Sequence, residues 1–363
     1  MERPLSYRLI TRLDPPGSVP SPPYRRFVAR ESADDRTVLL TVPHTGTDPA
    51  LFRQEAEAAQ RLPAPWTLPV TEVMATLDVV GAAGARDGAG APACAGPYVP
   101  ALPLPVALAV HGGPLPEEAV RVIGAALAET LAALHAQGAT HAGVSPAAVL
   151  LTADGPRLTC FGAGRVTDRV DREAQAPERA TGGVPRPPGD VYGLGAVLAY
   201  AATGHTVPER SELPPALRAT ITGCLAREPA DRPTAAALLP ALAPPTPHAT
   251  VLGSAASLLT PGWLPHRVVA ALARQSATLL AADLPATAPA TAPAGAAAGA
   301  ASPAAFPHAA GATPRAASPA DSPAGATPTA APTSTPAGTP HAPAPTAPAP
   351  ADFPGVSPVH PGN

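Results

Sequence analysis

The segment Leu134–Gly162 reads L-H-A-Q-G-A-T-H-A-G-V-S-P-A-A-V-L-L-T-A-D-G-P-R-L-T-C-F-G. It starts at the end of an Ala/Leu-rich stretch whose leucines have helical spacing, and Gly138 is typical of the left-handed residue that ends a helix. After a loop, the short apolar runs 148–152 and 157–160 flank a D-G pair, which is a strong signal for a β-hairpin. The segment therefore predicts a helix, a loop, a hairpin and a terminal F-G.

This order resembles the catalytic segment of the bacterial serine/threonine protein kinases related to the eukaryotic kinases, the Hanks type. That family writes H-R-D-L-x-x-x-N in its catalytic loop, with a lysine two residues after the Asp, and then D-F-G after a hairpin. His141, Phe161 and Gly162 match the family. Four positions depart from it: Gly143 stands at the catalytic Asp, Ser145 at the loop Lys, Ala148 at the metal-binding Asn and Cys160 at the metal-binding Asp.

The N-terminal part reads as strands over residues 5–45 and a helix over residues 49–62. In the family, a Gly-rich loop between the first two strands covers the ATP phosphates, but here it reads D-P-P-G-S-V-P-S-P-P-Y, and proline lacks the N–H that a phosphate cradle requires. Thr41 occupies the position of the third-strand lysine, and Glu55 occupies that of its helix Glu partner. The chain contains no Lys, so Glu55 is either a solvated helix residue or the partner of an arginine.

The resemblance continues through the adenine hinge to the closing helices. Tyr98 and Val99 are the hinge candidates for a nucleotide. Glu178 lies in an A-P-E motif and matches the family's Glu that pairs with an Arg, here Arg232 of D-R-P-T. Asp190 begins a nearly all-apolar helix. The matching Asp of the family holds the backbone of the catalytic loop, and the other interpretation is that Asp190 is an ordinary N-cap residue.

The composition of the chain argues against several other classes of function. The 363 residues carry a net charge of −3, which does not favour nucleic-acid binding, and the three Cys form neither a disulfide framework nor a metal knuckle. Because no signal region and no strongly apolar run of 18 residues is evident, we expect a cytoplasmic protein without a membrane span. A protein partner, another kinase or a signalling protein, is expected.

The expected architecture is α+β and two-lobed: a β-rich N-lobe over residues 1–100, a helical C-lobe over residues 101–245, a helical extension over residues 246–283 and a disordered Ala/Pro/Thr/Ser-rich tail over residues 284–363. A helix near residues 263–283 is predicted either to pack on the C-lobe or to bind a partner.

The pattern of retained and lost residues predicts a pseudokinase that acts as a signalling scaffold or regulator. The residues that hold the C-lobe together are kept, whereas those that touch ATP and metal are lost, so no metal is expected and no cofactor is assigned. ATP binding without Mg²⁺ stays open. The alternatives are an active Ser/Thr kinase with an atypical site, and a structural or interaction protein that uses the Pro-rich tail.

Overall fold

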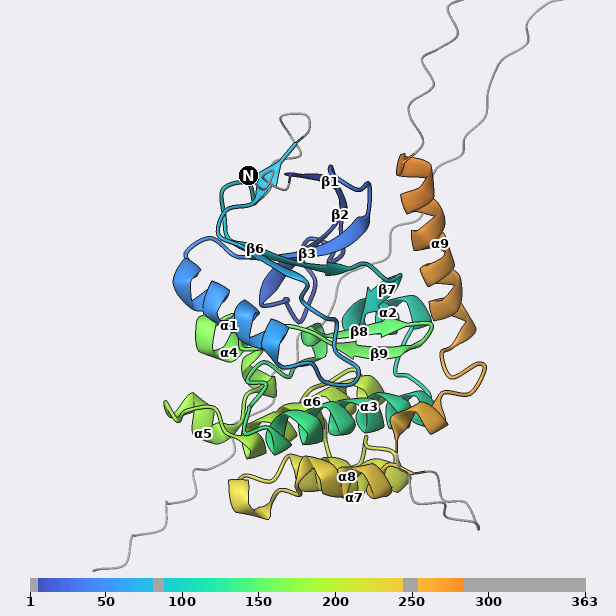
Figure 1. The fold of residues 1–363 in the computed structure, drawn as a ribbon. Helices are drawn as coiled ribbons and strands as arrows, with labels where there is room; N and C mark the ends of the chain where they lie inside the picture. The colour runs from blue at the N-terminus through green and yellow to red at the C-terminus, as the bar shows by residue number, and fades with distance from the viewer. Residues whose placement is uncertain (1–5, 81–87, 244–253, 284–363) are drawn as a thin grey trace, which may run out of the picture. The chain divides into compact units, whose positions relative to one another are not determined.

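The computed structural model describes residues 6–80, 88–243 and 254–283. The predicted tail, residues 81–87 and the first part of the 246–283 extension lie outside the described residues. The described N-terminal part is a six-stranded sheet with one helix, and the part that follows is mainly helical (Figure 1).

The N-lobe sheet has the strand order β4-β6-β3-β2-β1-β5. Its elements are β1 (Ser6–Arg12), β2 (Tyr24–Glu31), β3 (Thr37–Pro43), α1 (Pro49–Arg61), β4 (Glu72–Met74), β5 (Asp78–Val79) and β6 (Ala93–Pro97). Strand β3 is antiparallel to both β2 and β6, and the register places Thr41 opposite Arg26 on one side and Cys94 on the other. These three residues therefore form one row across the sheet.

The residues in and just before helix α1 explain where it starts and which face it buries. The side chain of Asp48 accepts hydrogen bonds from the backbone N–H of Ala50 and Leu51, which are otherwise unsatisfied at a helix start. A proline occupies the first turn, where its missing N–H costs nothing. Phe52 and Ala56, four residues apart, are buried on the inner face.

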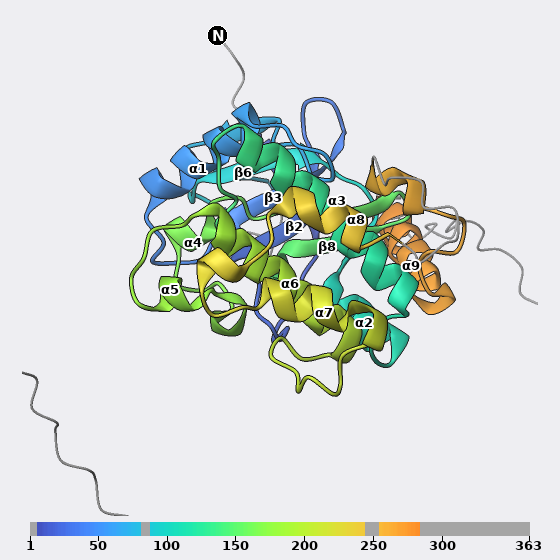
Figure 2. The same cartoon turned by 90° about the horizontal axis from the view of Figure 1, so that it is seen from below.

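The helical lobe starts with β7 and is viewed from below in Figure 2. Its elements are β7 (Ala101–Pro103), α2 (Leu104–His111), α3 (Glu117–Ala136), η1 (Pro146–Ala148), β8 (Val149–Thr152), β9 (Gly155–Leu158), α4 (Ala163–Val166), η2 (Arg172–Ala174), α5 (Pro177–Ala180), α6 (Pro187–Thr203), α7 (Pro215–Cys224), η3 (Pro229–Asp231), α8 (Ala235–Ala241), η4 (Ala255–Leu258) and α9 (His266–Asp283). Strands β7, β8 and β9 form a second sheet, which contains the predicted hairpin.

Helices α3 and α6 form the centre of this lobe. Both are apolar on nearly every face, and α6 ends at Gly204, which has a left-handed φ of 87°. By length and composition α3 could cross a membrane, but 72% of that stretch is buried inside the unit, as is usual for a central core helix.

Helix α9 packs against the start of the helical lobe, along α2 and β7 (Figure 1). Val268 and Leu272 are buried in this contact. The Gln275 side chain accepts a hydrogen bond of 3.1 Å from the backbone N–H of Ala101, and the Trp263 indole donates to the carbonyl of Ala153 at 3.1 Å. The extension is thus part of the folded unit, where it covers the connection between the lobes.

Candidate functional site

Asp190 holds the loop that resembles the catalytic loop. Its carboxylate accepts hydrogen bonds from the backbone N–H of His141 at 2.7 Å and of Ala142 at 2.8 Å, and it lies 3.0 Å from Nε2 of His135. Arg186, not Asp190, is the N-cap residue of α6. The geometry therefore matches the backbone-holding role that the resemblance implies, and not the N-cap alternative.

Gly143, at the position of the catalytic Asp, has no room for a side chain. A Cβ built on it would lie 2.4 Å from the backbone oxygen of Cys160 and 3.2 Å from Cβ of Ala163. The C-F-G segment is drawn this close by two backbone hydrogen bonds, from Gly162 N to His141 O at 2.8 Å and from Gly164 N to Ala142 O at 2.6 Å. No carboxylate can be placed here without a shift of the backbone.

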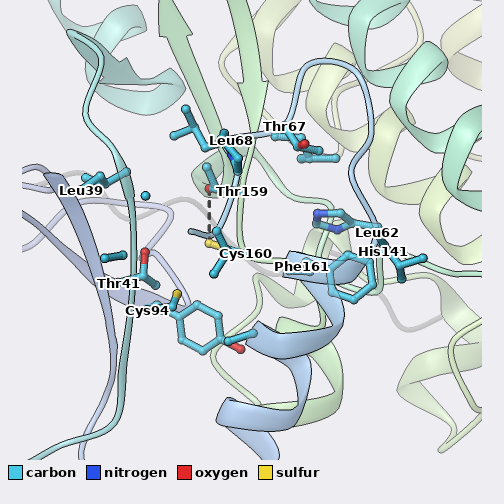
Figure 3. A pocket seen from close by; sticks show the side chains of 18 of the residues that line it. Leu39, Thr41, Leu62, Thr67, Leu68, Cys94, His141, Thr159, Cys160 and Phe161 are labelled. Atoms are coloured by element: carbon cyan, nitrogen blue, oxygen red, sulfur yellow. Dashed lines mark hydrogen bonds between the residues drawn. The ribbon is translucent and has the colours of Figure 1, made fainter. Parts of the chain in front are cut away.

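The positions of the family's metal ligands offer no oxygen ligand from a side chain. Ala148 is fully buried, and Cys160 directs its Sγ to 3.4 Å from Oγ1 of Thr159 (Figure 3). Burial raises the pKa of the Cys160 thiol, and Mg²⁺ prefers oxygen ligands. The described ranges contain no cluster of three or more His, Cys, Asp and Glu side chains that could hold a metal. These residues do not fit Mg²⁺.

Ser145, at the position of the loop lysine, is buried as well. Its hydroxyl has no hydrogen-bond partner in the part of the chain that the structure describes. A short neutral side chain here cannot supply the positive charge of the lysine.

An arginine that the sequence analysis did not identify lies between the two lobes. Arg26 of β2 is 1% exposed and forms a buried ion pair with Asp14, which follows β1. Its guanidinium also donates to the backbone oxygen of Ala147 at 2.9 Å and to Oγ1 of Thr159 at 3.1 Å. We call these four residues the interlobe clasp, because two come from the N-lobe and two from the loops of the C-lobe.

The clasp adjoins both metal positions, since Ala147 and Thr159 directly precede Ala148 and Cys160. Arg26 also lies directly opposite Thr41, the residue at the position of the family's phosphate-binding lysine. Four hydrogen bonds occupy its guanidinium, two of them to Asp14. A positive charge is thus present near the lysine position, but it is neutralised and hydrogen-bonded within the chain.

Glu55 has an arginine partner. Its carboxylate lies 3.3 Å from Nε of Arg165 in α4, the first turn after C-F-G, and it packs directly over Gly162. Burial raises the pKa of Glu55, and the charge of Arg165 opposes that rise. Arg165 also donates to the backbone oxygen of Thr140 at 2.7 Å. Of the two open interpretations of Glu55, the structure shows the paired one.

The hinge candidates lie away from the cavity between the lobes. Tyr98 and Val99 are half-buried, and neither lines that cavity. The backbone N–H of Tyr98 donates to Thr37 O at 3.4 Å, and Pro97, which does line the cavity, has no N–H. This stretch therefore presents few of the donors that a hinge offers to an adenine ring.

Glu178 and Arg232 form a two-pronged, partly buried ion pair in the helical lobe. The two nitrogen–oxygen distances are 2.7 and 2.8 Å, and the Arg232 side chain is fully buried. Arg232 also donates to the backbone oxygens of Ala226 and Pro188. Its hydrogen bonds lower the pKa of Glu178 and tie the A-P-E segment to the D-R-P-T segment.

No family model matches the chain. Among curated proteins, the chain is 33% identical over 265 residues to "Probable serine/threonine-protein kinase PkwA" of Thermomonospora curvata, and 32% identical over 280 residues to serine/threonine-protein kinase AfsK of Streptomyces coelicolor. The alignments cover 64% and 67% of this chain but 33% and 32% of those relatives. The chain thus spans about a third of the length of these relatives.

Among solved structures, a double mutant of the PknI kinase domain from Mycobacterium tuberculosis superposes with a TM-score of 0.52. The match covers 65% of this chain and 94% of that domain at 22% sequence identity, and it shows the fold alone. The α+β, two-lobed kinase fold that the motifs predict is thereby confirmed. The homologues of this chain are bacterial Hanks-type serine/threonine protein kinases, and the chain has the fold of a kinase domain.

Proposed function

We propose that this kinase-like unit transfers no phosphate and acts by binding a protein partner, as a scaffold or regulator in signalling. Phosphoryl transfer depends on positioning and on neutralisation of charge by metal ions and a lysine. Gly143, Ala148 and Cys160 supply no carboxylate, no amide and no fitting ligand for Mg²⁺. General-base catalysis alone contributes roughly 10²–10⁴-fold to such a reaction.

The interlobe clasp is the observation that carries this proposal. Its buried guanidinium lies beside both metal positions and is already paired, so a phosphate would have to replace Asp14 to bind it. Breaking a buried ion pair is costly, because the remaining charge is left without a partner. The ground state therefore favours an internally closed cleft over a nucleotide complex.

A partner-binding role is supported by what the fold retains. Asp190 and the pair of Glu178 with Arg232 hold the helical lobe together although the chemistry of the cleft is absent. The folded helical lobe would then be the functional part of the molecule, and another kinase or a signalling protein is the expected partner.

Two measurements on the full chain test the proposal: the melting temperature with ATP and Mg²⁺, and incorporation of label from radioactive ATP. The kinase domain of the relative AfsK serves as the active control. We expect neither a shift nor label. Incorporated label would overturn the inactive assignment.

The variant Arg26→Met separates two explanations of a nucleotide response. A shift by ATP in the native chain that is lost in Arg26→Met would mean that Arg26 binds phosphate, and it would refute the closed cleft. A shift that appears only in Arg26→Met would support the closed cleft, because removing the guanidinium would then have opened it.

A further inference from the structure

A cavity of about 90 Å³ lies between the lobes, next to the interlobe clasp. Its wall is formed by α1, β3, β6 and the C-F-G segment, with Phe52, Thr41, Cys94 and Cys160 among the lining side chains (Figure 3). Thr159 borders both features, because its hydroxyl accepts the hydrogen bond from Arg26 and its side chain lines the cavity. The clasp thus fills one part of the cleft while the part next to it stays open.

The lining is apolar and uncharged. None of the described residues that line the cavity is Asp, Glu or Arg. Burial raises the pKa of Cys94 to about 12 and also raises that of Tyr24, while burial lowers the pKa of His141 to about 4. At neutral pH these groups are therefore all neutral. A triphosphate would find no charge here to replace its hydration.

Two buried polar atoms at this cavity lack partners in the part of the chain that the structure describes: Oη of Tyr24 and Nδ1 of His141. Tyr24 is 3% exposed and His141 is 1% exposed, and both line the cavity. Figure 3 shows the His141 ring beside Leu62 and Phe161. Most buried polar groups in proteins have a partner, because an unsatisfied one is destabilising. A bound molecule with a hydroxyl group can satisfy either atom, since a hydroxyl both donates and accepts.

The size of the cavity limits the ligand. A volume of about 90 Å³ is of the same order as the roughly 150 Å³ engineered apolar cavity that binds benzene. A single ring or a short branched chain fits this space, whereas a nucleoside triphosphate does not.

We propose that this cavity binds a small, uncharged molecule that has an apolar body and a hydroxyl group. The apolar body lies against Phe52 and the neighbouring face of α1, and the hydroxyl pairs with Tyr24 or His141. The inference rests on the proposed function, because an adenine base held in the same cleft would compete for this space.

The test uses phenol as the probe and its isostere toluene, which lacks the hydroxyl, as the matched control. With the full chain, phenol at ten times its dissociation constant should raise the melting temperature by about 3–6 °C, since binding to the native state alone stabilises it. Toluene should bind more weakly, and Tyr24→Phe or His141→Asn should reduce the difference between the two compounds.

Ala59→Phe should abolish the shift by filling the cavity from α1, whereas the exposed Ala50→Phe on the same helix should leave it unchanged. Absence of a shift in the native chain, or an equal shift in Ala59→Phe, would overturn the inference. Tyr24→Phe keeps the cavity wall and serves as the second variant if Ala59→Phe does not fold. A response to ATP with Mg²⁺ would instead count against the proposed function, so the two failures are distinguishable.

Discussion

Asp14→Asn removes the counter-charge of Arg26 and keeps the size of the side chain. The ion pair is almost fully buried, with side-chain exposures of 1% for Arg26 and 4% for Asp14. Burial lowers the pKa of Arg26, and the neighbouring charge of Asp14 more than offsets that effect, so the net shift is upward. Without Asp14 the guanidinium would stay buried with neutral partners only, which is the situation in which breaking a pair is most destabilising.

The expected loss follows from this burial. Removing one partner of a buried pair costs about 3–5 kcal/mol of unfolding free energy. For a unit of this size, 1 kcal/mol corresponds to about 2–4 °C, so Asp14→Asn should lower the melting temperature by roughly 6–20 °C. Arg26→Met should show a loss in the same range, because it leaves Asp14 buried without its partner.

The assay is a double-mutant cycle of Asp14→Asn and Arg26→Met, in which the free energy of unfolding of each protein is measured in urea. The double variant should be more stable than the sum of the single losses predicts, since it leaves no unpaired charge. Glu57→Gln is the control, because Glu57 and Arg61 form an exposed pair at 3.7 Å that is worth less than about 1 kcal/mol. A loss for Asp14→Asn no larger than that for Glu57→Gln would refute the reasoning.

Three further outcomes are expected. Gly143→Asp should give no autophosphorylation and a lower melting temperature, because its Cβ would lie 2.4 Å from the backbone oxygen of Cys160; labelled protein would contradict this. Arg232→Gln should lower the unfolding free energy in urea by about 3 kcal/mol, because it removes the buried partner of Glu178, and a loss below 1 kcal/mol would be inconsistent with that pair. Burial lowers the pKa of His141 to about 4, so between pH 6.5 and 4 the unfolded chain binds a proton that the folded chain does not. Stability should therefore fall by about 3 kcal/mol as pH drops through that window, and His141→Asn should remove that part of the slope.

Local patterns predicted much of the fold. The helix expected over residues 49–62 is observed as Pro49–Arg61, because the cap at Asp48 and the apolar spacing of Phe52 and Ala56 are both written in neighbouring residues. The D-G pair likewise produces the hairpin of β8 and β9. Such features need only interactions between residues that are close in the chain.

The cleft could not be predicted in the same way. Arg26 and Thr159 are 133 residues apart, and nothing in either neighbourhood specifies their contact. One signal was present: Arg26 shares a face of β2 with Tyr24 and Val28, so strand periodicity places a charge between two apolar, buried neighbours. A charge at such a position requires a partner, but the sequence does not say which.

The sequence alone could not predict that the space beside Gly143 is filled by other atoms. A glycine at the place of the catalytic Asp indicates a lost carboxylate, but it does not indicate that the backbone oxygen of Cys160 fills the space beside it. Similarly, the absence of Lys left an arginine as the one cation for Glu55, and only the packing of α4 against α1 identifies Arg165.

Helix α9 has a consequence for the energetics of recognition. The hydrogen bond that the Gln275 side chain accepts from the backbone N–H of Ala101, and the packing of α9 on α2, hold the start of the helical lobe from outside. A partner that contacts the helical lobe beside α9 would meet a surface that is already held in place. The entropy lost in ordering that surface would then not be subtracted from the affinity of the partner.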